Sequence, residues 1–261
     1  ITDTSGALVV ATATTDSAAN LAVTFTSGNV TTTAAVAITG GAGNDTLTGA
    51  AAVDTITGGE GADILNGGAG IDSIILTETT AVIDKVYVAT NAGNDTITGF
   101  KVGAGGDQII LSEALIELDA AGTADTAWIN IDSTSSDVAN SDAVVISTIT
   151  GATNGDALTT DTDVIIANLA ANIASASVLE TALELGGSLA LTMNGAIANN
   201  DSFLVAYDDG TNSYLAHVES GATVDDDALA AVGGLTATVI ATLVGVADVT
   251  TLTAANFDII A

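Results

Sequence analysis

Four aspartates stand nine residues apart, at Asp45, Asp54, Asp63 and Asp72. Each is the sixth residue of a nine-residue unit, and four units follow one another without a gap: GGAGNDTLT, GAAAVDTIT, GGEGADILN and GGAGIDSII. Carboxylates that recur beside glycines, whose backbone carbonyls are bare, supply the oxygen ligands of a hard cation. Calcium takes about six to eight such oxygens. The pattern therefore predicts a calcium-binding segment.

The glycines and aliphatic residues of these units predict how the segment folds. Positions nine apart lie on opposite sides of a helix, so the period cannot make one apolar helical face. It indicates a chain that coils with two units per turn, with one aliphatic residue of each unit inside. Glycine permits the tight turns. The glycines at the second and fourth positions are Gly41, Gly43, Gly59, Gly61, Gly68 and Gly70, whereas the second unit has Ala50 and Ala52 there.

These units resemble the glycine-rich nonapeptides of the RTX family of calcium-binding proteins, which fold as a parallel β-roll. The resemblance implies that Asp45 and Asp63 share one calcium ion, and that Asp54 and Asp72 share another on the other side. Carbonyls of the six glycines named above would complete the cages. Ala50 and Ala52 resist a positive φ, which counts against the second site. The alternative is a glycine-rich β-solenoid that binds no metal.

The motif returns in part after the four units. Ala92–Thr98 reads AGNDTIT and continues into GFKVGAGGDQIIL, which resembles the segment that closes RTX rolls. Asp95 and Asp107 are therefore predicted as further calcium ligands, and Phe100 as a plug for the end of the apolar ladder. The alternative is an ordinary aspartate-led turn before a strand. Upstream, Ile38 lies nine residues before Leu47, so the ladder is expected to begin one unit early.

The charge excludes several classes of partner. The chain of 261 residues has a formal net charge of −30, with two lysines and no arginine. Binding to nucleic acid requires basic residues against phosphate, so it is excluded, and anionic membrane surfaces are disfavoured. Charge of this size opposes compaction unless cations screen it. Adaptation to salty surroundings is an alternative explanation. No cysteine is present, so calcium is the expected substitute for disulfide stabilisation.

Residues 113–261 carry no nonapeptides but alternate as strands do. Strands are expected in DAVVISTIT, TDVIIANLA and VIATLVGV, and DSFLVAY and NSYLAHVES flank a DDGT hairpin turn. Short helices are expected in SEALIELDA and SASVLETALELGG. Residues 228–247 are uncharged, but their glycines and threonines indicate strands of a soluble domain rather than a membrane span.

The expected fold class is all-β. A β-rich segment at 1–39 continues from an upstream region. A calcium-binding β-roll with its closing segment spans 40–112. A β-rich domain with one or two short helices spans 113–261. The first residues show no signal peptide, and the start at Ile1 indicates a fragment or a processed product. The end, LTAANFDIIA, resembles the C-terminal signal of proteins exported by type I secretion.

The sequence predicts no enzyme. His217 is the only histidine and there is no cysteine, whereas transition-metal sites usually need several of these residues. Composition and motif together resemble the C-terminal part of RTX-type bacterial surface-layer proteins. This likeness implies a secreted protein on the bacterial cell surface that folds with calcium and assembles with copies of itself. The implied further partners are the type I secretion apparatus and, through the upstream region, cell-surface polysaccharide. The alternative is the export and folding module of a larger RTX adhesin or hydrolase.

Overall fold

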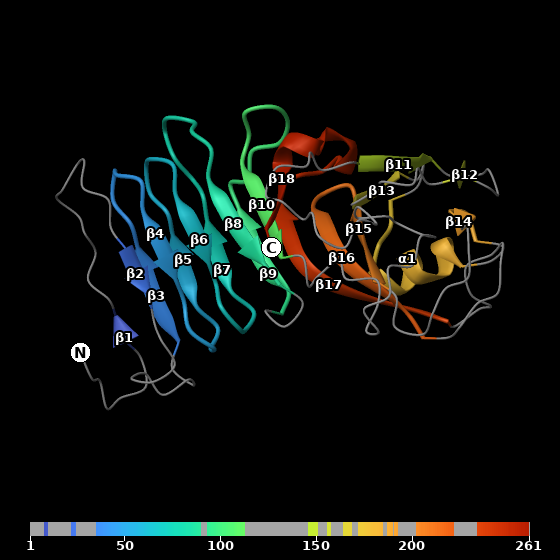
Figure 1. Ribbon diagram of the computed structural model, residues 1–261, viewed down its shortest axis with the longest axis horizontal. Coiled ribbons are helices and arrows are strands. Elements are labelled where there is room, and N and C mark those ends of the chain that lie inside the picture. The colour runs from blue at the N-terminus through green and yellow to red at the C-terminus, as the bar shows by residue number, and fades with distance from the viewer. Residues whose placement is uncertain are drawn as a thin grey trace. The chain divides into compact units, whose positions relative to one another are not determined.

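The computed structural model describes residues 8–9, 22–24, 35–89, 93–112, 146–150, 156–157, 164–168, 172–184, 187–189, 191–192, 202–221 and 234–260. The chain forms two compact units (Figure 1). The first contains Ile1–Leu111, Ile240–Val246 and Ala255–Asp258, and the second contains the remaining residues. Strands dominate both units, and the described residues contain one α-helix. The predicted β-dominated fold class is confirmed.

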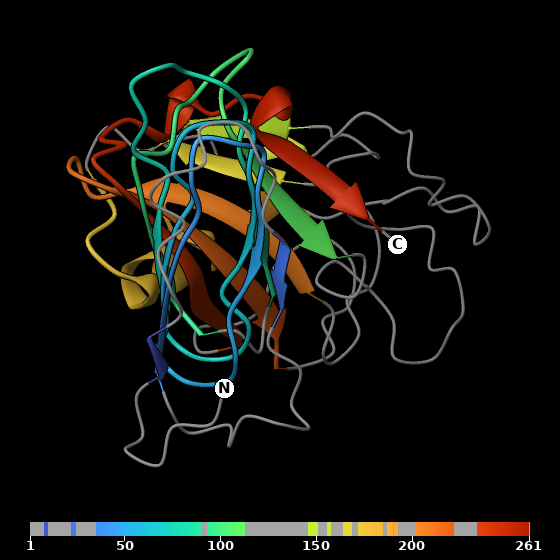
Figure 2. The same ribbon diagram turned by 90° about the vertical axis from the view of Figure 1, so that its left-hand side faces the viewer.

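The first unit is a parallel β-roll made of two layers of short strands (Figures 1 and 2). Successive strands alternate between the layers, so two units make one coil, as the nine-residue period predicts. One layer contains β1 (Leu8–Val9), β3 (Val36–Thr39), β5 (Thr55–Thr57), β7 (Ser73–Ile75) and β9 (Asp95–Thr98). The other contains β2 (Ala22–Thr24), β4 (Thr46–Thr48), β6 (Ile64–Asn66), β8 (Lys85–Val88) and β10 (Gln108–Ser112).

The interior of the roll is a ladder of single aliphatic side chains. In each three-residue strand the middle residue points inward, because alternate side chains of a strand face opposite sides. Ile38 pairs with Ile56, and Ile56 pairs with Ile74. All the residues of this ladder are 0–1% exposed: Ile38, Leu47, Ile56, Leu65, Ile74, Val86, Ile97 and Ile109. Burying each contributes about 1.5–3 kcal/mol. The ladder does begin before residue 40, as Ile38 predicts, and Phe100 is also buried.

Two strands from the C-terminal part of the chain complete the layers of the roll. Residues 241–244 of β17 (Leu235–Val244) pair in parallel with β9. β18 (Phe257–Ile260) lies beside β10. Without β17 and β18, β9 and β10 would be open edge strands, and open edges tend to pair with strands of other chains. No local pattern in the sequence predicts this return of the chain.

The second unit has a mixed sheet and one helix. β11 (Ile146–Thr150), β13 (Val164–Asn168) and β15 (Ser202–Asp208) are parallel, and β16 (Ser213–Ser220) pairs antiparallel with β15. Residues 235–239 of β17 follow in the strand order. β12 (Asp156–Ala157) pairs with β14 (Leu191–Thr192). Helix α1 (Ala176–Leu183) buries Leu179, Ala182 and Leu183. Two short 3₁₀ helices, η2 (Val249–Thr251) and η3 (Ala254–Asn256), lie near the C-terminus.

Several local predictions are confirmed. The DDGT turn joins β15 and β16, with Gly210 at a φ of 82°. The helix predicted in residues 175–187 is α1, and the strands predicted around 146–150, 164–168 and 235–244 are present. The helix predicted in SEALIELDA lies outside the described residues. No helix in the described ranges is long and apolar enough to cross a membrane.

Candidate calcium sites

The turns that join the two layers of the roll stack in two rows. The first row contains turns 40–45, 58–63, 76–84 and 99–107. The second row contains turns 49–54, 67–72 and 89–94, of which residues 90–92 are outside the described part. Each turn ends at an aspartate that lies immediately before, or begins, a strand. The first row thus aligns Asp45, Asp63, Asp84 and Asp107, and the second aligns Asp54, Asp72 and Asp95.

A continuous chain of hydrogen bonds connects the aspartates of each row. The backbone N–H of every aspartate except the last of each row donates to Oδ1 of the aspartate in the next turn, 18, 21 or 23 residues later, at 2.7–3.0 Å. Val36, which stands where an earlier aspartate would, donates in the same way to Asp54 at 2.8 Å. All seven aspartates are 0–1% exposed. Six of them were predicted as ligands, and the structure stacks Asp45 on Asp63 and Asp54 on Asp72, the two pairs that were predicted.

The second carboxylate oxygen distinguishes two kinds of aspartate. Oδ2 of Asp45 accepts from the N–H of Gly41 at 2.7 Å, and Oδ2 of Asp54 accepts from the N–H of Ala50 at 2.6 Å. Oδ2 of Asp63, Asp72 and Asp95 is buried and has no hydrogen-bond partner. Burying a carboxylate oxygen without a partner is costly. Oδ2 of Asp63 and of Asp72 lie against Gly58 and Gly67, the first residues of their own turns, and a cation bound there would satisfy them.

The electrostatics of the rows favour a bound cation. Burial raises the pKa of Asp63 and of Asp95 to about 7, against a usual value of 3.8. Burial likewise raises the pKa of Asp72 and of Asp84 to about 6. The negative charge of the neighbouring aspartates in the row adds to each of these pKa increases. A divalent cation would offset both effects, because an adjacent positive charge favours the ionised carboxylate.

The glycines allow the turns to stack at close range. Gly59, Gly61, Gly68 and Gly70 have φ values of 96–132°, in the left-handed region. A Cβ on Gly59 would overlap the carbonyl oxygen of Gly41, and a Cβ on Gly61 would overlap that of Gly43. The carbonyls predicted as ligands therefore lie against the next turn of the same row.

The same geometry explains the alanines of the second unit. The carbonyls of Ala50 and Ala52 lie where a Cβ on Gly68 and on Gly70 would be. The steric requirement for glycine thus falls on Gly68 and Gly70, in the turn that stacks on the alanines. The N–H of Ala50 still reaches Asp54, as the N–H of Gly41 reaches Asp45.

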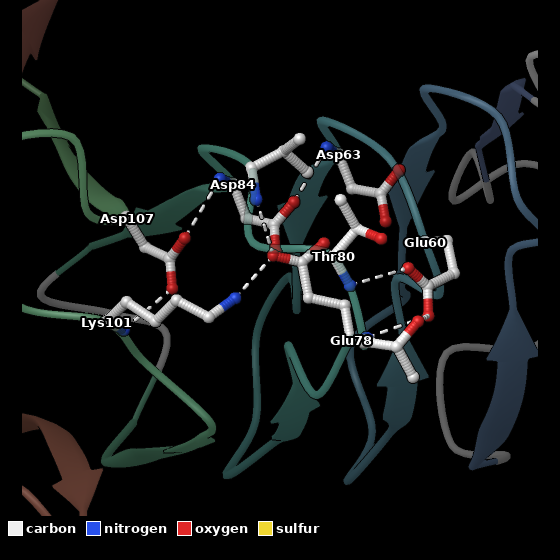
Figure 3. A network of polar contacts seen from close by, with 9 residues as sticks. Glu60, Asp63, Glu78, Thr80, Asp84, Lys101 and Asp107 are labelled. Carbon is white, nitrogen blue, oxygen red and sulfur yellow. Dashed lines mark hydrogen bonds and ion pairs between the residues drawn. The ribbon is translucent and has the colours of Figure 1, made fainter.

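The sequence analysis missed Asp84, although a signal was present. Asp84 stands two residues before the buried Val86, just as Asp45 stands two residues before Leu47. Asp84 is the last residue of turn 76–84, which is longer than the regular turns. Two glutamates accept hydrogen bonds from the backbone of this turn. Glu60 accepts hydrogen bonds from the backbone of Thr79 and Thr80 at 2.8 and 3.2 Å. Glu78, with a fully buried side chain, accepts from the N–H of Val82 at 2.8 Å. Figure 3 shows this part of the first row.

Calcium here would need ligands from the backbone as well as from side chains. In the part of the chain that the structure describes, no group of three or more histidine, cysteine, aspartate or glutamate side chains could hold a metal ion. Two carboxylates from successive turns, supplemented by turn carbonyls, match the oxygen preference of calcium. This is the composition of the cage that the sequence predicted.

The comparison with protein families agrees with this geometry. The family model of the RTX calcium-binding nonapeptide repeat matches in four copies, at residues 39–74 and 87–101. Among curated proteins, none matches this chain. Residues 39–101 of the first unit therefore contain RTX repeats, and repeats of this family bind several calcium ions.

Proposed function

We propose that this chain is a secreted structural protein that folds with calcium and assembles with its own copies in a bacterial surface layer. The observation that carries the calcium-dependent part is the set of buried Oδ2 atoms without partners at Asp63, Asp72 and Asp95. They make the stacked turns unfavourable without a cation and favourable with one.

The mechanism is folding coupled to calcium binding. Without calcium, the stacked carboxylates repel one another, so the repeat region is loose and able to pass through a secretion channel. Outside the cell, sites of extracellular modules typically bind calcium with dissociation constants of about 10⁻⁴ to 10⁻³ M. At ten times the dissociation constant, each site would add about 1.4 kcal/mol. Several such sites are enough to decide the folding of a marginally stable domain.

Composition supports the structural role. The chain is rich in small and β-branched residues, has no cysteine and carries a net charge of −30, which resembles RTX-type surface-layer proteins. We propose no catalytic activity for these residues. His217, the only histidine, is 7% exposed and has Glu219 at 3.6 Å. Burial lowers the pKa of His217, as expected for a side chain packed within a sheet.

The proposed partners are further copies of this chain, the type I secretion apparatus and, through an upstream region, cell-surface polysaccharide. The second candidate function is an export and folding module of a larger RTX adhesin or hydrolase. The RTX repeats favour it equally, because they account for calcium-dependent folding without assembly.

A calcium titration of the purified chain separates the two candidates. Circular dichroism would report folding and light scattering would report particle size, with chelator added back as the control. Folding together with growth into large ordered particles supports the surface layer. Folding into a monomer supports the export module. A circular dichroism spectrum that calcium leaves unchanged would refute calcium-dependent folding itself.

A further inference from the structure

The last turn of the first row, 99–107, differs from the other turns in its charge. It carries Lys101, whose Nζ forms an ion pair with Oε1 of Glu78 in the preceding turn (Figure 3). The Glu78 side chain is completely buried, whereas the Lys101 side chain is 34% exposed. A positive charge therefore already lies between turns 76–84 and 99–107, the interval that would otherwise hold a calcium ion.

Asp107, in the same interval as Lys101, has both carboxylate oxygens hydrogen-bonded. Oδ1 of Asp107 accepts from the N–H of Asp84 at 3.0 Å, and Oδ2 accepts from the N–H of Lys101 at 2.8 Å. Lys101 also interacts electrostatically with Asp84 and Asp107. By contrast, Oδ2 of Asp63, one turn earlier than Asp84, has no partner.

Asn256 binds the backbone of the same turn. It comes from η3 and is 0% exposed. Its Oδ1 accepts from the N–H of Gly103 at 2.8 Å. Its Nδ2 donates to the carbonyl of Asp107 at 2.9 Å, and lies 3.3 Å from those of Lys101 and Gly103. Turn carbonyls, which elsewhere would be available to a cation, are here bound by an amide of the protein.

We propose that turn 99–107 is a built-in cap that needs no calcium. The Lys101 ammonium takes the place of the ion between turns 76–84 and 99–107, and the Asn256 side chain binds the backbone of turn 99–107. This inference rests on the proposed calcium-driven folding of the other turns.

The first test counts calcium ions. Native mass spectrometry at saturating calcium would compare the wild type with Lys101→Gln and Lys85→Gln. Lys85 is a matched control, because it is the only other lysine and pairs with Asp258 at 3.2 Å, with both side chains about 40% exposed. We expect Lys101→Gln to bind one more ion per chain than the wild type, and Lys85→Gln to bind the same number.

The second test measures hydrogen exchange of the wild type in chelator. We expect amides of residues 99–111 to be protected while those of residues 40–72 exchange freely, and Asn256→Ala to remove the protection of residues 99–111. An unchanged ion count in Lys101→Gln, or equal exchange of the two segments in the wild type, would overturn the cap alone. A wild type that binds no calcium would refute the proposed function as well.

Discussion

The two units of this chain keep their interiors together by different means. The roll has a core that is one aliphatic side chain wide, flanked by rows of buried aspartates. The second unit has a broad apolar core in which helix and sheet residues interdigitate. That core contains Ile149, Ile165, Ala167, Ile173, Leu179, Ala182, Leu183, Leu189, Phe203, Val205, Tyr207, Ala216, Val218 and Leu235.

The two units also differ in how many of their described buried polar side-chain atoms lack a hydrogen-bond partner. Among the described residues, the buried side-chain oxygens without a partner belong to Asp63, Asp72, Glu78 and Asp95, all in the first unit. In the second unit the acidic turn residue Asp209 accepts from Tyr214 Oη at 2.6 Å and from the N–H of Thr211 at 2.8 Å. Under the proposed function, bound calcium would compensate the buried carboxylates of the roll, whereas apolar packing stabilises the second unit.

Calcium removal is expected to have the largest effect. In chelator, the amides of residues 40–72 should lose nearly all protection from hydrogen exchange, because the stacked carboxylates then repel without compensation. The amides of β15 and β16 should remain protected. Hydrogen exchange followed by mass spectrometry measures both segments in one sample. Parallel loss of protection in the two units would contradict a calcium dependence confined to the roll.

Phe203→Ala should produce the converse result. Phe203 is 2% exposed in the core of the second unit, and large-to-small substitutions of this kind cost about 3–5 kcal/mol. We expect the second unit to melt at lower temperature with and without calcium, while calcium still protects residues 40–72. Calcium that fully restored the melting of Phe203→Ala would show that the two interiors are not independent.

The pH dependence of the calcium-free roll should be opposite to that of most folded proteins. Asp63 and Asp95 have a pKa of about 7 when folded, and Asp72 and Asp84 about 6, all above the usual 3.8. The folded state thus binds more protons than the unfolded state between about pH 4 and pH 7, so its stability falls as pH rises through this window. In chelated samples, thermal melting of the roll should be higher at about pH 5 than at about pH 8. Saturating calcium should reverse the order, because protons compete with the ion.

Asp63→Asn tests how much one buried carboxylate contributes to the pH dependence of the calcium-free roll. The amide keeps Oδ1 for the N–H of Asp45 but removes the charge, so the calcium-free roll should be stabilised at about pH 8 while calcium stabilises it less. Asp209→Asn is the control, because hydrogen bonding from Tyr214 lowers the pKa of Asp209 and the same substitution should destabilise. A calcium-free roll that is less stable in Asp63→Asn would refute the repulsion.

The sequence predicted the repeating part of the fold because every nine-residue repeat carries glycine, aspartate and an aliphatic residue at the same positions. The nine-residue period, the inward aliphatic and the aspartate before each strand recur in fixed phase, so Asp45 and Asp63 could be paired without a structure. Asp84 was missed because the turn before it is longer, which breaks the period while the Asp-Lys-Val spacing to the buried Val86 persists. Counting from the strand rather than from the glycines would have found it.

The closing segment was predicted, but the contacts that the C-terminal part of the chain makes with it could not be, because they join residues far apart in the sequence. Asn256 lies 149 residues from the carbonyl of Asp107 that it binds, and β17 reaches β9 from residues 241–244. No local period encodes such pairings. The ion pair between Lys101 and Glu78 is likewise invisible until turns 76–84 and 99–107 are known to stack.

The smallest predicted effect concerns the N-cap of helix α1 in the second unit. Ser175 is the N-cap of α1, and its side chain accepts from the N–H of Val178. Ser175→Ala should lower the free energy of unfolding of this unit by about 1 kcal/mol, equally with calcium and with chelator. Thr181→Ala, at an exposed site on the same helix, should stay within about 0.5 kcal/mol of the wild type. Hydrogen exchange of the β15 amides across a denaturant series measures the change. A calcium-dependent loss in Ser175→Ala would mean that the second unit's stability also draws on the ions of the roll.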